Sequence, residues 1–110
     1  MTLEDKLYLK MKKYSEQFKS SESCGLLYKD FSSGDIEFEG CKNVHPEPEK
    51  FFEISPKEYL RTSSKGEITA AFHSHPFTEG PSERDIHISK NLQIPFVIYS
   101  LKTKKFYYTE

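Results

Sequence analysis

Two histidines separated by one residue, His73 and His75, follow the apolar segment 68–72. The segment is typical of a buried strand. Side chains two positions apart on a strand point to the same face, with backbones about 6.6 Å apart, so both imidazoles can reach one metal ion. Pro76 has no amide hydrogen to give to a ladder and is expected to end the strand directly after them.

An acidic side chain follows the histidines after a short polar loop. Glu83 and Asp85 both stand near the start of a predicted helix, and Ser82 with Asp85 also forms a helix-capping signature that needs no chemistry. The two interpretations are compatible, because a helix can be capped by Ser82 and still direct a carboxylate toward the strand end. Two histidines and one carboxylate leave the fourth position of a tetrahedral zinc ion for water, which is typical of a catalytic site.

Amide hydrolysis at such a site also needs a base to accept the proton of the attacking water, although zinc lowers the pKa of that water to about 7. The residues themselves offer four candidates, and their spacing does not choose among them. The candidates are Glu22, Glu53, Glu79 and Glu83.

The elements that must position these side chains alternate between helices and strands, with hairpins on either side of the middle. An amphipathic helix is expected over residues 2–19, with Leu3, Leu7, Met11, Tyr14 and Phe18 on one stripe. The pattern predicts an α+β fold, with helices packed on a mixed central sheet. The other expected elements are strands at 24–28, 36–44, 51–54, 67–75, 95–101 and 106–109, and helices at 55–65 and 82–91.

Length and composition restrict the classes of function. The 110 residues predict a single domain, 1–110, and the 16 basic and 17 acidic residues give no basic surface for nucleic acid or anionic membranes. No apolar run approaches the roughly 20 residues of a membrane span. The N-terminus lacks the pattern of a secretory signal, which favours a cytoplasmic location.

The two cysteines, Cys24 and Cys41, are too few for a disulfide framework. Both fall in predicted strands of one hairpin, where a cross-strand bridge is geometrically conceivable. Reduced thiols that behave as small apolar side chains are favoured for a chain without an export signal.

Three separated blocks together resemble the signature of the JAMM zinc metallopeptidases, the catalytically competent members of the JAB/MPN family. The blocks are residues 22–27, 73–76 and 82–85. The resemblance implies a cytidine-deaminase-like architecture, and one zinc ion bound by His73, His75 and Asp85. It also implies that Glu22 is the general acid/base and that Ser82 stabilises the oxyanion.

The segments between the blocks are similar to the N-terminal JAMM domain of the tail-tip assembly proteins K of lambda-like phages. The similarity involves Cys41, Asn43 and residues 51–59 and 66–68, and it extends over most of residues 14–100. In that group an NlpC-type cysteine peptidase domain usually follows. One departure is the loop between His75 and Ser82, where six residues stand in place of the usual seven.

This resemblance implies a hydrolase that cleaves an amide or isopeptide bond at a phage or prophage tail tip, in the host cytoplasm or in the virion tail. Its partners would be a peptide, a peptidoglycan peptide or a tail-tip protein. Two alternatives stay open. The first alternative is a bacterial JAMM peptidase that processes a ubiquitin-like sulfur-carrier protein. The second is a non-catalytic MPN assembly scaffold.

Overall fold

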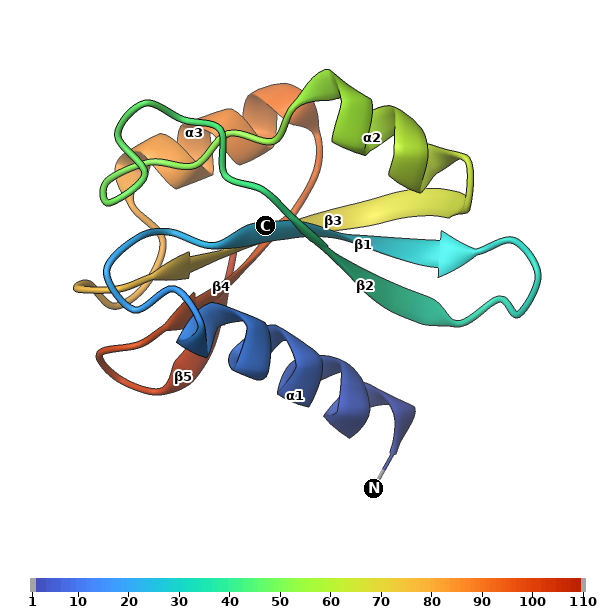
Figure 1. Ribbon diagram of the computed structural model, residues 1–110, viewed down its shortest axis with the longest axis horizontal. Helices are drawn as coiled ribbons and strands as arrows, with labels where there is room; N and C mark the ends of the chain where they lie inside the picture. Colours follow the sequence, from blue (N-terminus) through green and yellow to red (C-terminus); the bar gives the residue numbers. More distant parts are fainter. Residues whose placement is uncertain (1, 110) are drawn as a thin grey trace.

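A computed structural model describes residues 2–109, except for the side chain of Leu3, one of the five positions on the predicted apolar stripe. The predicted α+β architecture is confirmed: one mixed five-stranded sheet has the strand order β2-β1-β3-β4-β5 (Figure 1). The elements are α1 (Leu3–Glu16), β1 (Cys24–Asp30), β2 (Ile36–Cys41), α2 (Pro56–Ser63), β3 (Gly66–His75), α3 (Glu83–Leu92), β4 (Phe96–Ser100) and β5 (Lys105–Tyr108).

Strand β3 is the centre of the sheet. It pairs antiparallel with β1 on one side and parallel with β4 on the other. Helix α3 connects β3 to β4, as a parallel pair requires a crossover. The end of β3 that carries the histidines therefore lies beside the end of β4, where His75 is the partner of Ser100.

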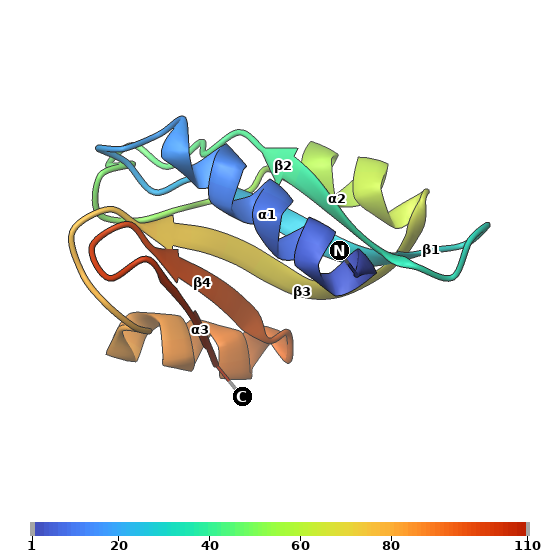
Figure 2. The ribbon, with the colours of Figure 1, turned by 90° about the horizontal axis from the view of Figure 1, so that it is seen from below.

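The helices cover both faces of the sheet. Helix α1 lies on one face, and α2 and α3 lie on the other (Figures 1 and 2). Along β3, Ala71 belongs to the core under α2 and α3, whereas Phe72 belongs to the core under α1. His73 and His75 continue the alternation of Ala71, so both imidazoles leave the sheet on the α2–α3 face.

Helix α3 begins as the sequence predicts. Ser82 is the cap residue: its hydroxyl oxygen accepts a hydrogen bond from the Asp85 amide, and the Asp85 carboxylate accepts one from the Ser82 amide. This reciprocal capping box fixes the first turn of the helix, so it also fixes the direction of the Asp85 side chain.

The predicted strand at 51–54 is wrong, because this segment belongs to a loop that crosses the α2–α3 face. The side chain of Asn43 takes the place of a neighbouring strand: its amide group donates to the Phe51 carbonyl and accepts from the Glu53 amide. Two backbone bonds add to these: the Val44 amide donates to the Glu53 carbonyl, and the Phe51 amide donates to the Glu47 carbonyl. The segment therefore forms no strand ladder with the described residues.

Three predicted elements run two or three residues past their observed ends. The first helix ends at Glu16 rather than at residue 19, the second strand ends at Cys41 rather than at residue 44, and α2 ends at Ser63. At the first two places the chain leaves its element to build the loops around the candidate site.

Cys24 and Cys41 are register partners on β1 and β2, and both are buried free thiols, as predicted. Neither takes part in the contacts among the candidate site residues described below. No helix within residues 2–109 has the length and apolar character needed to cross a membrane.

Candidate metal centre

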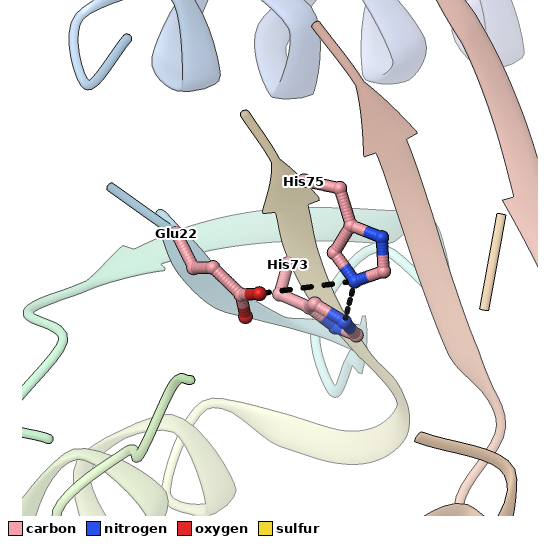
Figure 3. Close-up of side chains that lie close together, drawn as sticks. All are labelled: Glu22, His73 and His75. Carbon is pink, nitrogen blue, oxygen red and sulfur yellow. Dashed lines mark hydrogen bonds and ion pairs between the residues drawn. The ribbon is translucent and has the colours of Figure 1, made fainter. Parts of the chain in front are cut away.

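The two histidines of β3 point at one another from the same face of the sheet (Figure 3). The Nε2 atoms of His73 and His75 lie 3.2 Å apart. His73 is fully buried and His75 is 4 % exposed, so neither ring nitrogen of His73 has access to bulk water. The convergence predicted from the His-x-His spacing is present.

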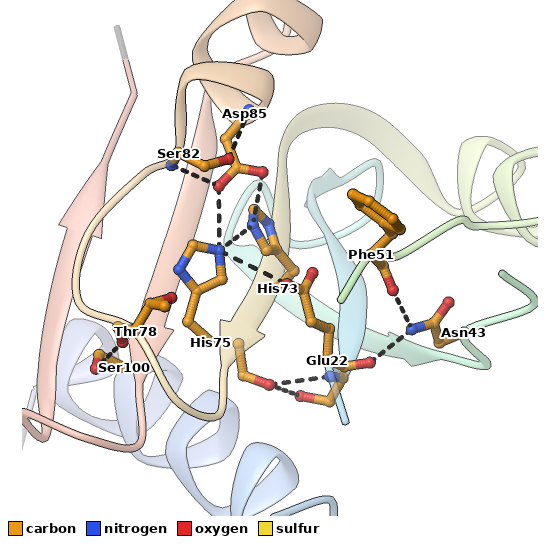
Figure 4. Close-up of polar contacts among 11 residues, drawn as sticks. Glu22, Asn43, Phe51, His73, His75, Thr78, Ser82, Asp85 and Ser100 are labelled. Carbon is orange, nitrogen blue, oxygen red and sulfur yellow. Dashed lines mark hydrogen bonds and ion pairs between the residues drawn. The ribbon is translucent and has the colours of Figure 1, made fainter. Parts of the chain in front are cut away.

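Asp85 reaches both imidazoles from the first turn of α3 (Figure 4). One carboxylate oxygen, Oδ1, lies 3.2 Å from Nε2 of His73, and the other, Oδ2, lies 3.1 Å from Nε2 of His75. The short loop between His75 and Ser82 thus still brings α3 onto the end of β3. The Ser100 hydroxyl holds this loop by donating to the Thr78 carbonyl at 2.6 Å.

The donor set fits a zinc ion. Two imidazole nitrogens and a carboxylate face one another at 3.1–3.2 Å. In a tetrahedron with metal–ligand bonds of about 2.0 Å, neighbouring ligand atoms are about 3.3 Å apart. The three distances join four atoms, because each oxygen of Asp85 faces a different imidazole. Lone-pair atoms at this spacing repel one another unless shared protons or a cation lie among them, and one divalent cation meets this need.

Packing supports the orientation of the histidine rings. The Phe52 ring stacks on His73 with 4.3 Å between the ring centroids and 18° between the planes. Neither Nδ1 atom has a hydrogen-bond partner within residues 2–109. The stacked phenyl ring therefore restrains His73 in the way that a second hydrogen bond restrains most metal-binding histidines.

Burial and hydrogen bonding set the charges of these groups. Burial lowers the pKa of His73 and so favours the neutral imidazole, which is the form that binds metals. Burial by itself would raise the pKa of Asp85, but hydrogen bonds from His73, His75 and the Ser82 amide hold it well below its usual range. These shifts favour an ionised Asp85 and a neutral His73, which are the forms in which the two side chains bind metals.

Glu22 lies two residues before β1, against the same cluster. It is 8 % exposed, and its Oε2 atom is 3.8 Å from Nε2 of His75. One ligand atom from each of Glu22, His73 and His75 lies within 4.8 Å of the others, so Glu22 is itself close enough to be considered as a ligand. Its greater distance from His75 than that of Asp85 suits a group beside the metal rather than on it.

The protonation of Glu22 is unusual for a carboxyl group. Burial and the neighbouring Asp85 charge raise its pKa to about 8, and Arg84 opposes this effect. A carboxyl group that titrates near neutral pH can both accept and return a proton. The other three candidate bases, Glu53, Glu79 and Glu83, are exposed.

Two polar contacts pin the backbone around Glu22. Its amide donates to the Pro48 carbonyl at 2.7 Å, and its carbonyl accepts from the Asn43 side chain at 2.8 Å. The hydroxyls of Ser23 and Ser74 lie 2.8 Å apart, and Ser74 sits between the two histidines in the sequence. The acid is thereby tied to the strand that carries the two histidines.

A cleft with a volume of about 270 Å³ opens over the cluster. Ser82 lies on its wall, and its hydroxyl oxygen accepts from the Asp85 amide, so its own proton remains available for a substrate oxygen. The other lining residues are Glu22, Lys50, Phe51, Phe52, His75, Thr78, Arg84, Asp85 and Ile88.

Four of the five predicted site residues, Glu22, His75, Ser82 and Asp85, line this cleft, and the buried His73 contacts His75 and Asp85. Sequence reasoning gave no role to Asn43, Phe52 and Arg84. Asn43 positions Glu22, Phe52 packs on His73, and Arg84 lines the cleft. The only signal for Asn43 and Phe52 was that they belong to the segments quoted for the phage-like resemblance.

Asn43→Ala is expected to destabilise the protein by about 2–4 kcal/mol, since it leaves two carbonyls and two amides of the loop without their partners. Urea unfolding measures the change. Asn91→Ala is the matched control, because Asn91 is exposed and bonds only the side chain of His87. Equal stability of the two variants would show that Asn43 does not hold the loop.

Among the comparisons with known proteins, one supports the fold and another matches only part of the sequence. No family model matches the chain. A segment of 46 residues, 41% of this chain, is 41% identical to the tail tip assembly protein K of Escherichia phage N15. The match covers 19% of the length of that phage protein.

A solved structure of similar fold is the solution structure of a protein from Salinibacter ruber. It is 20% identical in sequence, with a TM-score of 0.52, and the match covers 88% of this chain and 70% of that one. At this identity the likeness supports the fold and says nothing of function.

Proposed function

We propose that this protein is a zinc-dependent hydrolase of the JAMM type that cleaves an amide or isopeptide bond. The observation that carries the proposal is the convergence of His73, His75 and Asp85 at 3.1–3.2 Å, with the buried Glu22 carboxylate beside them at 3.8 Å. A buried set of lone pairs with a separate acid of raised pKa has the parts that metal-assisted hydrolysis needs.

In this proposal His73, His75 and Asp85 hold the zinc ion. Zinc supplies Lewis acidity, which polarises the scissile carbonyl and acidifies water. Glu22 accepts a proton from the attacking water and returns it to the leaving amine, so one water is consumed and an acid and an amine are released. The Ser82 hydroxyl donates a hydrogen bond to the developing oxyanion.

The biological setting is proposed from the phage similarity. Because a segment of this chain resembles part of a tail tip assembly protein, we place the activity at a phage or prophage tail tip. The substrate would be a peptidoglycan peptide or a tail protein. No observation favours the sulfur-carrier or the scaffold alternative. If the chain does not bind zinc, the scaffold interpretation becomes the preferred one.

Zinc content tests the proposal. The wild type is expected to bind one zinc ion per chain, and the double variant His73→Ala with His75→Ala is expected to bind none, because two of the three ligands are gone. Elemental analysis after dialysis measures the ratio.

The matched control changes the other two histidines, His45 and His87. Neither residue lines the cleft. His45 accepts a hydrogen bond from the Glu47 amide, and His87 contacts Asn91. The control should retain the metal. Equal zinc content in the wild type and the His73/His75 double variant would remove the site.

A further inference from the structure

We propose that Arg84 makes this cleft selective for peptides that carry a carboxylate next to the scissile amide. The inference deepens the proposed function and rests on it. Arg84 takes no part in the proposed bond cleavage, and its positive charge indicates the class of substrate.

Arg84 lies on the wall of the same cleft as Glu22, His75 and Asp85. It precedes Asp85 in the first turn of α3, so the helix that positions the metal-binding carboxylate also positions this guanidinium. The guanidinium carbon is 4.6 Å from the centroid of the Phe51 ring. A guanidinium held over an aromatic face loses part of its freedom and keeps its N–H groups directed outward.

Arg84 forms no ion pair in the part of the chain that the structure describes. Within residues 2–109 no carboxylate lies at ion-pair distance from it, whereas Arg61, for comparison, contacts both Glu39 and Glu58. A planar guanidinium with unused N–H groups is well suited to bind a carboxylate through two parallel hydrogen bonds. The substrate is the natural source of that carboxylate.

The charges of the cleft agree with this assignment. Its lining holds two carboxylates, Glu22 and Asp85, and two permanent cations, Lys50 and Arg84. The two acids carry at most two negative charges, so the two positive charges of a bound zinc ion offset them fully and leave the two cations in excess. Lys50 pairs only with Glu47 at 3.9 Å, and both side chains are exposed, so this pair removes little of the excess. A loaded cleft therefore attracts anions.

The competing explanation is that Arg84 only fastens the loop at Phe51 over the site. The two explanations differ in what they predict for a charged and an uncharged ligand of the same shape. A fastening role affects both ligands equally, whereas a recognition role affects only the carboxylate.

The test compares two peptides, acetyl-Ala-Glu-Ala-amide and acetyl-Ala-Gln-Ala-amide, titrated into ¹⁵N-labelled protein with and without one equivalent of zinc. The wild type is expected to bind the glutamate peptide at least about 10-fold more tightly, as a charge-assisted bidentate contact provides. Arg84→Gln is expected to bring the two affinities within about 2-fold of each other, because the bidentate contact is lost. Arg84→Lys should fall between them, since it keeps the charge without the planar fork.

Lys90→Gln is the control, because it removes one exposed positive charge from the far end of the same helix. It should retain the wild-type preference, and the spectra also report whether each variant is folded. The proposal is overturned if the wild type shows no preference, if the glutamate peptide fails to shift cleft resonances, or if Arg84→Gln keeps the preference.

The zinc-free titration separates this proposal from the proposed function. Arg84 does not depend on the metal for its position, so some preference is expected without zinc. Loss of zinc binding would defeat the hydrolase and leave the preference intact. A preference that exists only with zinc and persists in Arg84→Gln would mean that the carboxylate binds the metal, which contradicts the role given to Arg84.

Discussion

Glu22→Gln is expected to keep zinc and to lose hydrolysis by a factor of about 10²–10⁴, the usual contribution of a positioned acid/base group. The amide side chain preserves the shape of the buried site but cannot accept a proton. The three proposed metal ligands are unchanged, so metal content is expected to remain at one per chain.

The measurement pairs zinc analysis with the release of amino groups from purified muropeptides, identified by mass spectrometry. Glu53→Gln and Glu79→Gln are the matched controls, because both residues are exposed acids that the sequence offered as bases. They should retain full activity. Undiminished turnover in Glu22→Gln would mean that the base lies elsewhere, and loss of zinc would make Glu22 a ligand.

Much of the fold was predictable because local signals and tertiary packing agree. Ser82 with Asp85 predicts the start of α3, and the apolar run before His73 predicts the central strand. The segment at 51–54 is the exception. Its backbone bonds to the side chain of Asn43, eight to ten positions away, and not to a neighbouring strand. A segment whose backbone pairs with a side chain can have the same amino-acid composition as a segment that pairs with a strand.

The site divides in the same way. The two histidines were predictable from spacing alone, because the period of a strand brings alternate residues to one face. Glu22 was one of four candidate bases, and only the family resemblance singled it out, because it joins the site through the pairing of β1 with β3. Arg84 carries no sequence signal, because its significance depends on the absence of an ion pair with any described residue and on the Phe51 ring beside it.

Asp85→Asn is expected to weaken zinc binding by at least about 100-fold, more than the usual effect of losing an outer-sphere partner. The asparagine keeps an oxygen that can accept from the Ser82 amide, so the cap of α3 should persist. What disappears is the negative charge between His73 and His75. Competition with a chromophoric chelator measures the affinity, and Glu83→Gln is the control, because Glu83 is an exposed acid in the same turn.

This variant assigns the ligands, because two carboxylates compete for that role. Asp85 lies 3.1 Å from Nε2 of His75 and Glu22 lies 3.8 Å from it, and both are buried. If Asp85→Asn binds zinc as the wild type does and Glu22→Gln does not, the ligands are Glu22, His73 and His75, and Asp85 becomes the acid beside them. If the affinities fall in the expected order, the helix-borne carboxylate holds the metal, and Glu22 is free to move a proton.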